Sequence, residues 1–179
     1  MNRISDKIEI RQETADDFPE VFTINRSAFG QDNEAKLVEA LRNNPKVFVP
    51  ELSLVAAVRN KIVGHILFSR IQITDSMGSI HESLGLAPMA VTPEYQKKGI
   101  GGKLVRKGLE RARGLGFNAV IVLGHEHYYP RFGFKPAAKW NIKAPFDVPS
   151  NVFMAIELVK GGLKNISGTV RYPKEFETV

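Results

Sequence analysis

The order of apolar and polar residues predicts strands and helices along the chain. Residues 8–12 alternate apolar and polar side chains, as a half-buried strand does. Thr14 and Asp17 resemble a capping box, with aspartate in place of glutamate or glutamine, and predict a helix after them. The apolar face of this helix comprises Phe18, Val21, Phe22, Ala28 and Phe29. A second helical pattern runs from residue 32 to about residue 44, where an Asn-Asn-Pro sequence ends it.

Two apolar segments, residues 54–58 and 62–68, flank a short polar loop and predict an antiparallel hairpin. Their apolar runs are nearly continuous, so we expect helices to cover both faces of the sheet. Residues 74–83 are polar and predict a turn. Residues 84–91 are apolar and predict another buried strand, which Pro88 interrupts.

From Gly99 the apolar spacing becomes helical. The predicted stripe comprises Ile100, Leu104, Val105, Leu109, Ala112 and Leu115, and Gly114 and Gly116 mark the end of the helix. Residues 119–123 have the composition of a central strand, and residues 127–132 predict a short helical turn.

The remainder of the chain is rich in proline and lysine but still predicts strands at residues 152–158 and 168–171. Trp140 and Phe146 either line a substrate mouth or pack over the sheet, and packing is the favoured interpretation. The order of elements predicts one mixed α/β domain over residues 1–179. Its core spans about residues 8–159, and a C-terminal extension covers residues 160–179.

Composition excludes several classes of protein. The chain has 179 residues, of which 43% are hydrophobic and 25% charged, so it is not collagen-like, coiled-coil or disordered. It contains no cysteine, which rules out disulfides, thiolate metal sites and cysteine nucleophiles. The N-terminus lacks the apolar core of a secretory signal, and no stretch approaches the roughly 20 apolar residues that span a bilayer. We therefore expect a soluble, cytoplasmic protein.

Positive charge is concentrated in one segment. Residues 94–113 hold seven basic and two acidic side chains and carry five of the six excess positive charges. This concentration indicates an anionic partner bound at one place, although a solvated helix face is the alternative. A nucleic-acid surface would interleave basic residues with exposed aromatic ones over several elements, and that pattern is missing.

A glycine-rich loop lies within this segment, between the strand that ends at Val91 and the helix that follows. The first N–H groups of a helix lack internal partners, and glycines let a diphosphate approach them closely. Lysines add positive charge at Lys97, Lys98 and Lys103. The alternative is a glycine turn that only joins strand to helix. Leu104 excludes the Walker pattern, which needs Ser or Thr at that position. It also excludes the dinucleotide fingerprint, which needs glycine there.

The residues from Gln96 to Gly101 resemble the acetyl-CoA-binding motif of GCN5-related N-acetyltransferases (GNAT), which reads Gln/Arg-x-x-Gly-x-Gly/Ala. Residues 128–134, Tyr-Tyr-Pro-Arg-Phe-Gly-Phe, resemble a segment of a bacterial branch of predicted acetyltransferases. The resemblance implies the GNAT fold, an α/β arrangement with a central, mostly antiparallel sheet and a splayed parallel strand pair flanked by helices. The splayed strands would be residues 84–91 and 119–123.

The resemblance also implies acetyl-CoA as the co-substrate. Pantetheine would bond main-chain groups of Met89 and Val91, and N–H groups near Met89 and Ala90 would polarise the acetyl carbonyl. The pyrophosphate would lie on amides from Lys97 to Lys103. The implied cofactor-binding residues are Met89, Ala90, Val91, Gln96, Lys97, Lys98, Gly99, Ile100, Gly101, Gly102 and Lys103.

The tyrosine that protonates the departing thiolate in the family corresponds to Tyr129, four residues before Gly133. The alternative is that Tyr129 only packs against pantetheine, and we expect Tyr128 to be structural. Candidates for the base that deprotonates the acceptor are His125, Glu126 and Glu34. The histidines of His125-Glu126-His127 are two residues apart, unlike those of a zinc-protease helix, so we expect no metal.

Together these features predict an acyltransferase that moves an acetyl group from acetyl-CoA to a primary amine. Without cysteine, direct attack is simpler than a covalent acyl-enzyme. The alternative function is a non-catalytic acyl-CoA-binding sensor or interaction module. The sequence does not choose the acceptor amine. We expect no nucleic-acid or membrane partner, and a homodimer remains open.

Overall fold

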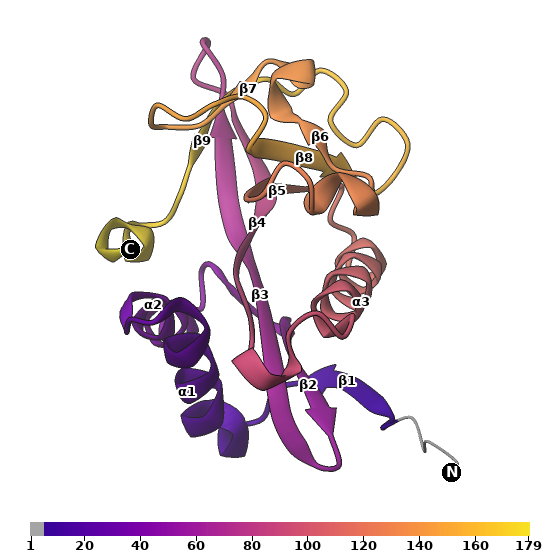
Figure 1. Ribbon diagram of the computed structural model, residues 1–179. Helices are drawn as coiled ribbons and strands as arrows, with labels where there is room; N and C mark the ends of the chain where they lie inside the picture. Colours follow the sequence, from indigo (N-terminus) through magenta and orange to yellow (C-terminus); the bar gives the residue numbers. More distant parts are fainter. Residues whose placement is uncertain (1–5) are drawn as a thin grey trace.

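The computed structural model describes residues 6–179, which form a nine-stranded mixed sheet with helices on both faces (Figure 1). The strands are β1 (Ile8–Gln12), β2 (Phe48–Val58), β3 (Lys61–Thr74), β4 (Ile80–Val91), β5 (Ala119–Leu123), β6 (Lys135–Pro136), β7 (Ile142–Lys143), β8 (Phe153–Glu157) and β9 (Gly168–Arg171). The helices are α1 (Phe18–Phe29), α2 (Asn33–Arg42) and α3 (Ile100–Gly114). Short 3-10 helices are η1 (Ala15–Asp17), η2 (Pro93–Tyr95), η3 (Tyr129–Phe132), η4 (Ala137–Trp140) and η5 (Lys174–Thr178).

The N-terminal segment, for which the sequence predicts no secretory signal, lies mostly in residues 1–5, outside the described part of the chain. Within residues 6–179, no helix is both long and apolar enough to cross a bilayer. The cytoplasmic location stays a prediction.

The strand order of the sheet is β1-β2-β3-β4-β5-β8-β6, and β9 pairs with β3 and β7. Neighbouring strands are antiparallel except for the pairs β4–β5 and β7–β9, which are parallel. The predicted mixed sheet, mostly antiparallel with one central parallel pair, is confirmed.

Helices cover both faces of the central strands, as the continuous apolar runs predict (Figure 1). On one face, α3 buries Ile100, Leu104 and Val105 against β2, β3 and β4. On the other face, α1 and α2 bury Val21, Ile24 and further side chains against the opposite side of β2 and β3. Alternate residues of the long central strands therefore enter different cores.

The strands β3 and β4 are longer than the sequence pattern predicts. The expected turn over residues 74–83 is wrong at its C-terminal end, because residues 80–83 belong to β4. The turn itself is narrow, and its Asp75 Oδ1 accepts hydrogen bonds from the amides of Met77 and Ser79, both at 2.9 Å. Residues 81–83 are polar, and this end of the hairpin extends beyond the helices that cover the centre of the sheet (Figure 1).

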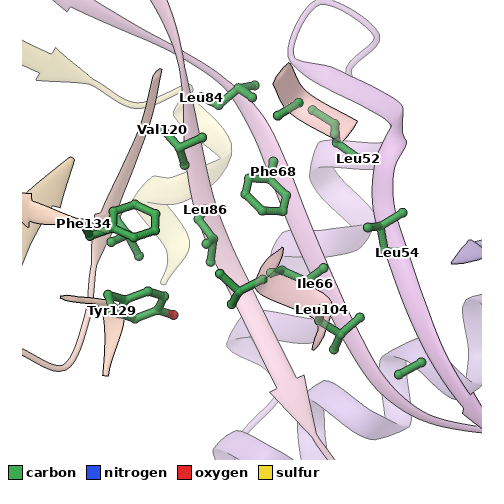
Figure 2. Close-up of a cluster of buried hydrophobic side chains, with 14 of the residues drawn as sticks. Leu52, Leu54, Ile66, Phe68, Leu84, Leu86, Leu104, Val120, Tyr129 and Phe134 are labelled. Carbon is green, nitrogen blue, oxygen red and sulfur yellow. The ribbon is translucent and has the colours of Figure 1, made fainter. Parts of the chain in front are cut away.

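The buried stripe of α3 differs from the predicted one at its C-terminal half. Gly108 is buried, Leu109 is only partly buried, and Leu115 lies after the helix with 46% of its surface exposed. A Cβ at position 108 would overlap the ring of Phe68, which is fully buried in the same core (Figure 2). A glycine inside a helix is unfavourable by itself, so this contact explains its presence.

The parallel strands β4 and β5 separate soon after they pair. Their register includes only Leu84 with Val120 and Gly85 with Ile121, whereas β4 continues to Val91. The β3–β4 register shifts between Ile66 and Phe68, which leaves Ala87 and Pro88 opposite a single residue of β3. Proline cannot donate to a ladder, and such a bulge bends the strand that contains it. The bulge therefore lies where β4 leaves β5.

A group of polar side chains is buried beneath α1 and α2. Glu13 forms a two-point ion pair with Arg42, with N–O distances of 2.9 and 3.0 Å. His65 is fully buried, with Asn25 Nδ2 at 3.3 Å from Nδ1 and Ser53 Oγ at 2.9 Å from Nε2. Because an amide nitrogen only donates, Nδ1 accepts and Nε2 carries the proton of the neutral ring.

We expect Gly108→Ala to lower the free energy of unfolding by about 1–3 kcal/mol, because the overlap with Phe68 outweighs the up to about 1 kcal/mol that alanine gains in a helix. Urea unfolding would measure the loss. Gly114→Ala is the matched control, since nothing lies within 4 Å of its added methyl group, and it should not destabilise the protein. A fully stable Gly108→Ala variant would contradict this packing.

Stability should also depend on pH through His65. Burial lowers the pKa of His65 from 6.5 to about 4, so between these values the unfolded chain binds a proton that the folded chain does not. The contribution of neutral His65 to the free energy of unfolding is therefore complete above about pH 6.5. It is lost as the pH falls towards 4, by up to about 3 kcal/mol. Unfolding measured across this range should show a shallower dependence for His65→Gln than for the wild type. Equal slopes would contradict the prediction.

Candidate active site

A cavity of about 950 Å³ opens where β4 and β5 separate. Residues 86–91 of β4 form one wall, and residues 123–125, at and just after the end of β5, form another. The remaining lining comes from α1 and α2, from the loop before α3 and the start of α3, from η3, and from residues before β8 and near the C-terminus. The cavity therefore lies where the resemblance implied a splayed strand pair.

Main-chain groups of β4 face this gap. Thr92 N donates to Val63 O at 2.9 Å, which makes Thr92 and Val63 a hydrogen-bonded pair. Hydrogen-bonded and non-hydrogen-bonded pairs alternate along an antiparallel ladder, so Ala90 bonds to β3, whereas Met89 and Val91 do not. The N–H and C=O groups of Met89 and Val91 thus point away from β3, and β5 no longer pairs with β4 there.

The loop before α3 presents a second set of main-chain donors. Gly99 adopts a left-handed conformation, with φ of 83°, and Lys103 N makes the first helical hydrogen bond, to Gly99 O at 3.2 Å. The amides of Ile100, Gly101 and Gly102 precede that bond and have no intrahelical acceptor. Gln96 Nε2 donates to Val91 O at 3.0 Å and so joins the loop to the end of β4.

Most of the residues that the resemblance implied for acetyl-CoA line the cavity. These are Met89, Ala90, Val91, Gln96, Lys97, Gly99, Ile100, Gly101 and Gly102. Lys98 and Lys103 do not line it, and the Lys98 ammonium instead lies 5.1 Å from the centre of the Tyr95 ring. The structure adds Arg106 and Arg131, whose place beside the cavity the spacing of charges did not indicate.

Tyr129 lines the cavity and is buried, with 8% of its surface exposed. Its ring packs edge-on against Phe134, with centroids 5.6 Å apart, and in Figure 2 its oxygen points towards β4. A Cβ on Gly124 would overlap this ring, so only glycine fits after β5. Burial raises the pKa of Tyr129, which therefore remains protonated at neutral and moderately alkaline pH.

Tyr128, expected to be structural, also lines the cavity. A Cβ on Gly101 would lie 2.8 Å from the Tyr128 hydroxyl, so this hydroxyl lies against the start of α3. The Arg131 guanidinium stacks over the Tyr128 ring at 4.8 Å. Burial raises the pKa of Tyr128, while Arg131 and Arg106 oppose that rise. The sequence did not indicate this position, because adjacent residues of a helical turn were expected to face different directions. In the structure both tyrosines line the cavity.

The candidate bases lie in different places. His125 and Glu34 line the cavity, whereas Glu126 does not. Glu126 accepts a hydrogen bond from Asn151 and lies 3.3 Å from His127 Nε2, beside a second, shallower depression. Among residues 6–179, no three His, Asp or Glu side chains are grouped as metal ligands.

Aromatic side chains form the wall opposite α3. Phe29 comes from α1, Phe146 from the loop before β8, and Tyr172 and Phe176 from the C-terminal segment. Trp140 instead packs against the core between β5, β8 and β9. The sequence offered Trp140 and Phe146 for a substrate mouth, and of these Phe146 lines the cavity; it did not indicate Tyr172 and Phe176, because only long-range folding brings the C-terminal aromatics here.

Comparison with known proteins agrees with this geometry. The family model of the acetyltransferase (GNAT) family matches residues 9–134. The chain is 43% identical over 134 residues to the N-acetyltransferase YjhQ of Escherichia coli strain K12, covering 74% of this chain and 73% of that protein. It is 32% identical over 168 residues to the N-acetyltransferase YhbS of the same strain, covering 93% and 97%.

Two solved structures are similar over nearly the whole chain. Escherichia coli YhbS, crystallised with CoA, superposes with a TM-score of 0.88 at 30% identity, covering 99% of this chain and 96% of that one. A GNAT family acetyltransferase of Brucella melitensis, crystallised with acetyl-CoA, gives a TM-score of 0.77 at 32% identity, covering 95% and 98%. The chain therefore belongs to the GNAT family of acetyltransferases and is an acyltransferase.

Proposed function

We propose that this protein transfers an acetyl group from acetyl-CoA to a primary amine by direct attack. The observation that carries the proposal is the pair of donor sets in one cavity: the outward main-chain groups of Met89 and Val91, and the free amides at the start of α3. Two similar proteins crystallised with CoA or acetyl-CoA support the co-substrate.

The proposed binding mode divides the carrier between these donors. Pantetheine lies along β4 and bonds the main chain of Met89 and Val91, as an additional strand would. The diphosphate lies on the amides of Ile100, Gly101 and Gly102, where the partial positive charge of the helix start favours an anion. The cations Lys97, Arg106 and Arg131 line the same side of the cavity and strengthen that preference.

In the reaction, the neutral amine attacks the thioester carbonyl, a C–N bond forms and the C–S bond breaks. The amine loses one proton and the sulfur gains one. The Met89 N–H is the main-chain donor available to the oxyanion, because the β3–β4 register commits the Ala90 N–H to His65. This refines the expectation that both amides polarise the carbonyl.

Tyr129 serves as the acid in this scheme. Because burial raises its pKa, the phenol keeps its proton over the working pH range and donates a hydrogen bond to the sulfur as negative charge develops. Its ring packs against Phe134 and lies directly against Gly124, where any side chain would overlap it. Such fixation favours catalysis, since little reorganisation is needed during the reaction.

His125 is the best-supported base of the three candidates. It follows Gly124 after the end of β5 and lines the cavity near Tyr129, and histidine is the side chain that most often serves as a general base. The carboxylate of Glu126 is instead engaged with Asn151 outside the cavity. The remaining candidate, Glu34, lies in the first turn of α2.

We expect Tyr129→Phe to bind acetyl-CoA normally but to turn over at least about tenfold more slowly, because it loses the donor to the thiolate. CoA release with a panel of amines would measure turnover, and calorimetry would measure binding. Tyr128→Phe is the matched control: it removes a hydroxyl from the same cavity, and its kcat should fall by less than about threefold.

Equal turnover by Tyr129→Phe and the wild type would remove Tyr129 from the acid role. If both proteins bound acetyl-CoA but neither turned it over with any amine, a non-catalytic acyl-CoA sensor would be the better interpretation. The sensor has no use for the Tyr129 hydroxyl, whereas the acyltransferase depends on it.

We expect Gly101→Val to weaken acetyl-CoA binding at least about tenfold with little loss of stability, because the branched side chain would enter the cavity beside Tyr128 and cover the free amides. Calorimetry with acetyl-CoA and thermal unfolding would separate the two effects. Gly114→Val, at the other end of α3 and clear of neighbours, should bind normally. Unchanged affinity of Gly101→Val would show that the loop assignment is wrong.

A further inference from the structure

Charged side chains in the cavity are divided between the two faces of the sheet. The cations Lys97, Arg106 and Arg131 lie on the side of α3 and η3. Glu34, in the first turn of α2, is the only acidic side chain among the described residues that line the cavity. Since α2 and α3 cover opposite faces, the negative charge lies away from the proposed phosphate site (Figure 1).

The Glu34 carboxylate accepts hydrogen bonds from one neighbouring side chain. Gln31 Nε2 donates to both of its oxygens at 3.1 Å, and Glu34 itself is half-buried. Neither oxygen is paired with a cation within residues 6–179, although the chain carries a net charge of +6. A positioned carboxylate in a cavity wall favours a cationic ligand.

The surface beside Glu34 is apolar and aromatic. Phe146 and Tyr172 stack with centroids 6.3 Å apart, and Tyr172 contacts Phe176 at 5.0 Å. Glu175 accepts a hydrogen bond of 2.8 Å from Asn44, which holds η5 against the end of α2. Burial raises the pKa of Tyr172 to about 12, so its phenol is neutral at neutral pH.

We infer that the acceptor is a primary amine on an apolar body that carries a second, cationic group, with the body against Phe146, Tyr172 and Phe176 and the cation paired with Glu34. This inference rests on the acetyl transfer proposed above and specifies the acceptor class. The aromatic wall accounts for the body, and the single carboxylate accounts for the second charge.

The second charge is distinct from the reacting nitrogen. The reacting nitrogen must lose its proton before it attacks, and pairing with a carboxylate would favour the protonated form. A remote ammonium stays charged from binding to product release, so its ion pair with Glu34 holds the substrate throughout. Glu34 is therefore a binding residue for the acceptor, and His125 remains the candidate base.

Three amines of one length test the charge requirement: hexamethylenediamine, hexylamine and aminocaproate. They share a primary amine on a six-carbon chain and differ only in the positive, neutral or negative group at the far end. We expect kcat/KM to fall in that order and to be at least about tenfold higher for the diamine than for aminocaproate, after correction for its two equivalent amines. Equal values, or a preference for aminocaproate, would overturn the inference.

Glu34→Gln tests the residue. It should reduce the ratio of kcat/KM for the diamine to that for aminocaproate to about threefold or less, mainly through KM. Glu39→Gln on the same helix, exposed and outside the cavity, should keep the wild-type ratio. If Glu34→Gln instead lowered kcat equally for all three amines, Glu34 would act in the chemistry and the inference would be wrong.

Phe146→Ala tests the apolar wall. It should raise the KM of hexamethylenediamine several-fold, while the KM of ethylenediamine, which has almost no apolar body, should change little. Leu115→Ala is the matched control, because both side chains are 46% exposed and Leu115 lies outside the cavity. An equal effect of Phe146→Ala on both diamines would contradict the assigned wall.

Calorimetry separates this inference from the proposed function. A protein that binds acetyl-CoA but neither binds nor acetylates the diamine in preference to aminocaproate would overturn the acceptor class and leave acetyl transfer standing. A protein that does not bind acetyl-CoA would overturn the proposed function itself.

Discussion

The separation of β4 from β5 is the constraint on which the site depends. Pairing ends at Gly85, and the bulge at Ala87 and Pro88 turns the rest of β4 away from its neighbour. A fully paired β4 would satisfy its main chain with β5 and leave no free donor. Because the strands part, the main-chain groups of Met89 and the N–H of Val91 have no partner in β5 and remain available to a ligand, while the Val91 carbonyl accepts a hydrogen bond from Gln96.

Small residues shape the cavity as much as the polar ones do. Gly124 leaves room for the Tyr129 ring, Gly101 leaves room for the Tyr128 hydroxyl, and Gly108 lets α3 approach Phe68. In each case a methyl group would approach a neighbouring aromatic side chain too closely, so the glycine fixes where that side chain lies. The positions of the two tyrosines therefore depend on Gly124, in the loop after β5, and on Gly101, in α3.

Positive and negative side chains line different sides of the cavity. Cations and free amides lie near the start of α3, whereas Glu34 and the aromatic wall lie on the side of α1, α2 and η5. An anionic carrier and a cationic acceptor would enter from different sides and meet at β4. The buried ion pair of Glu13 and Arg42 and the neutral His65 lie under α1 and α2 and are part of the framework that holds that side.

The sequence by itself determined the fold class, most element positions and the glycine-rich loop, because hydrophobic periodicity and the need for side-chain-free amides are local properties. It also singled out Tyr129 and Phe146 as candidates. Only the tertiary structure decided that the main-chain N–H and C=O groups of Met89 and Val91, and not those of Ala90, point away from β3 towards the cavity, since this depends on strand register. It also brought Tyr172 and Phe176 beside Glu34, because contacts between segments more than a hundred residues apart leave no periodic signal in a single sequence.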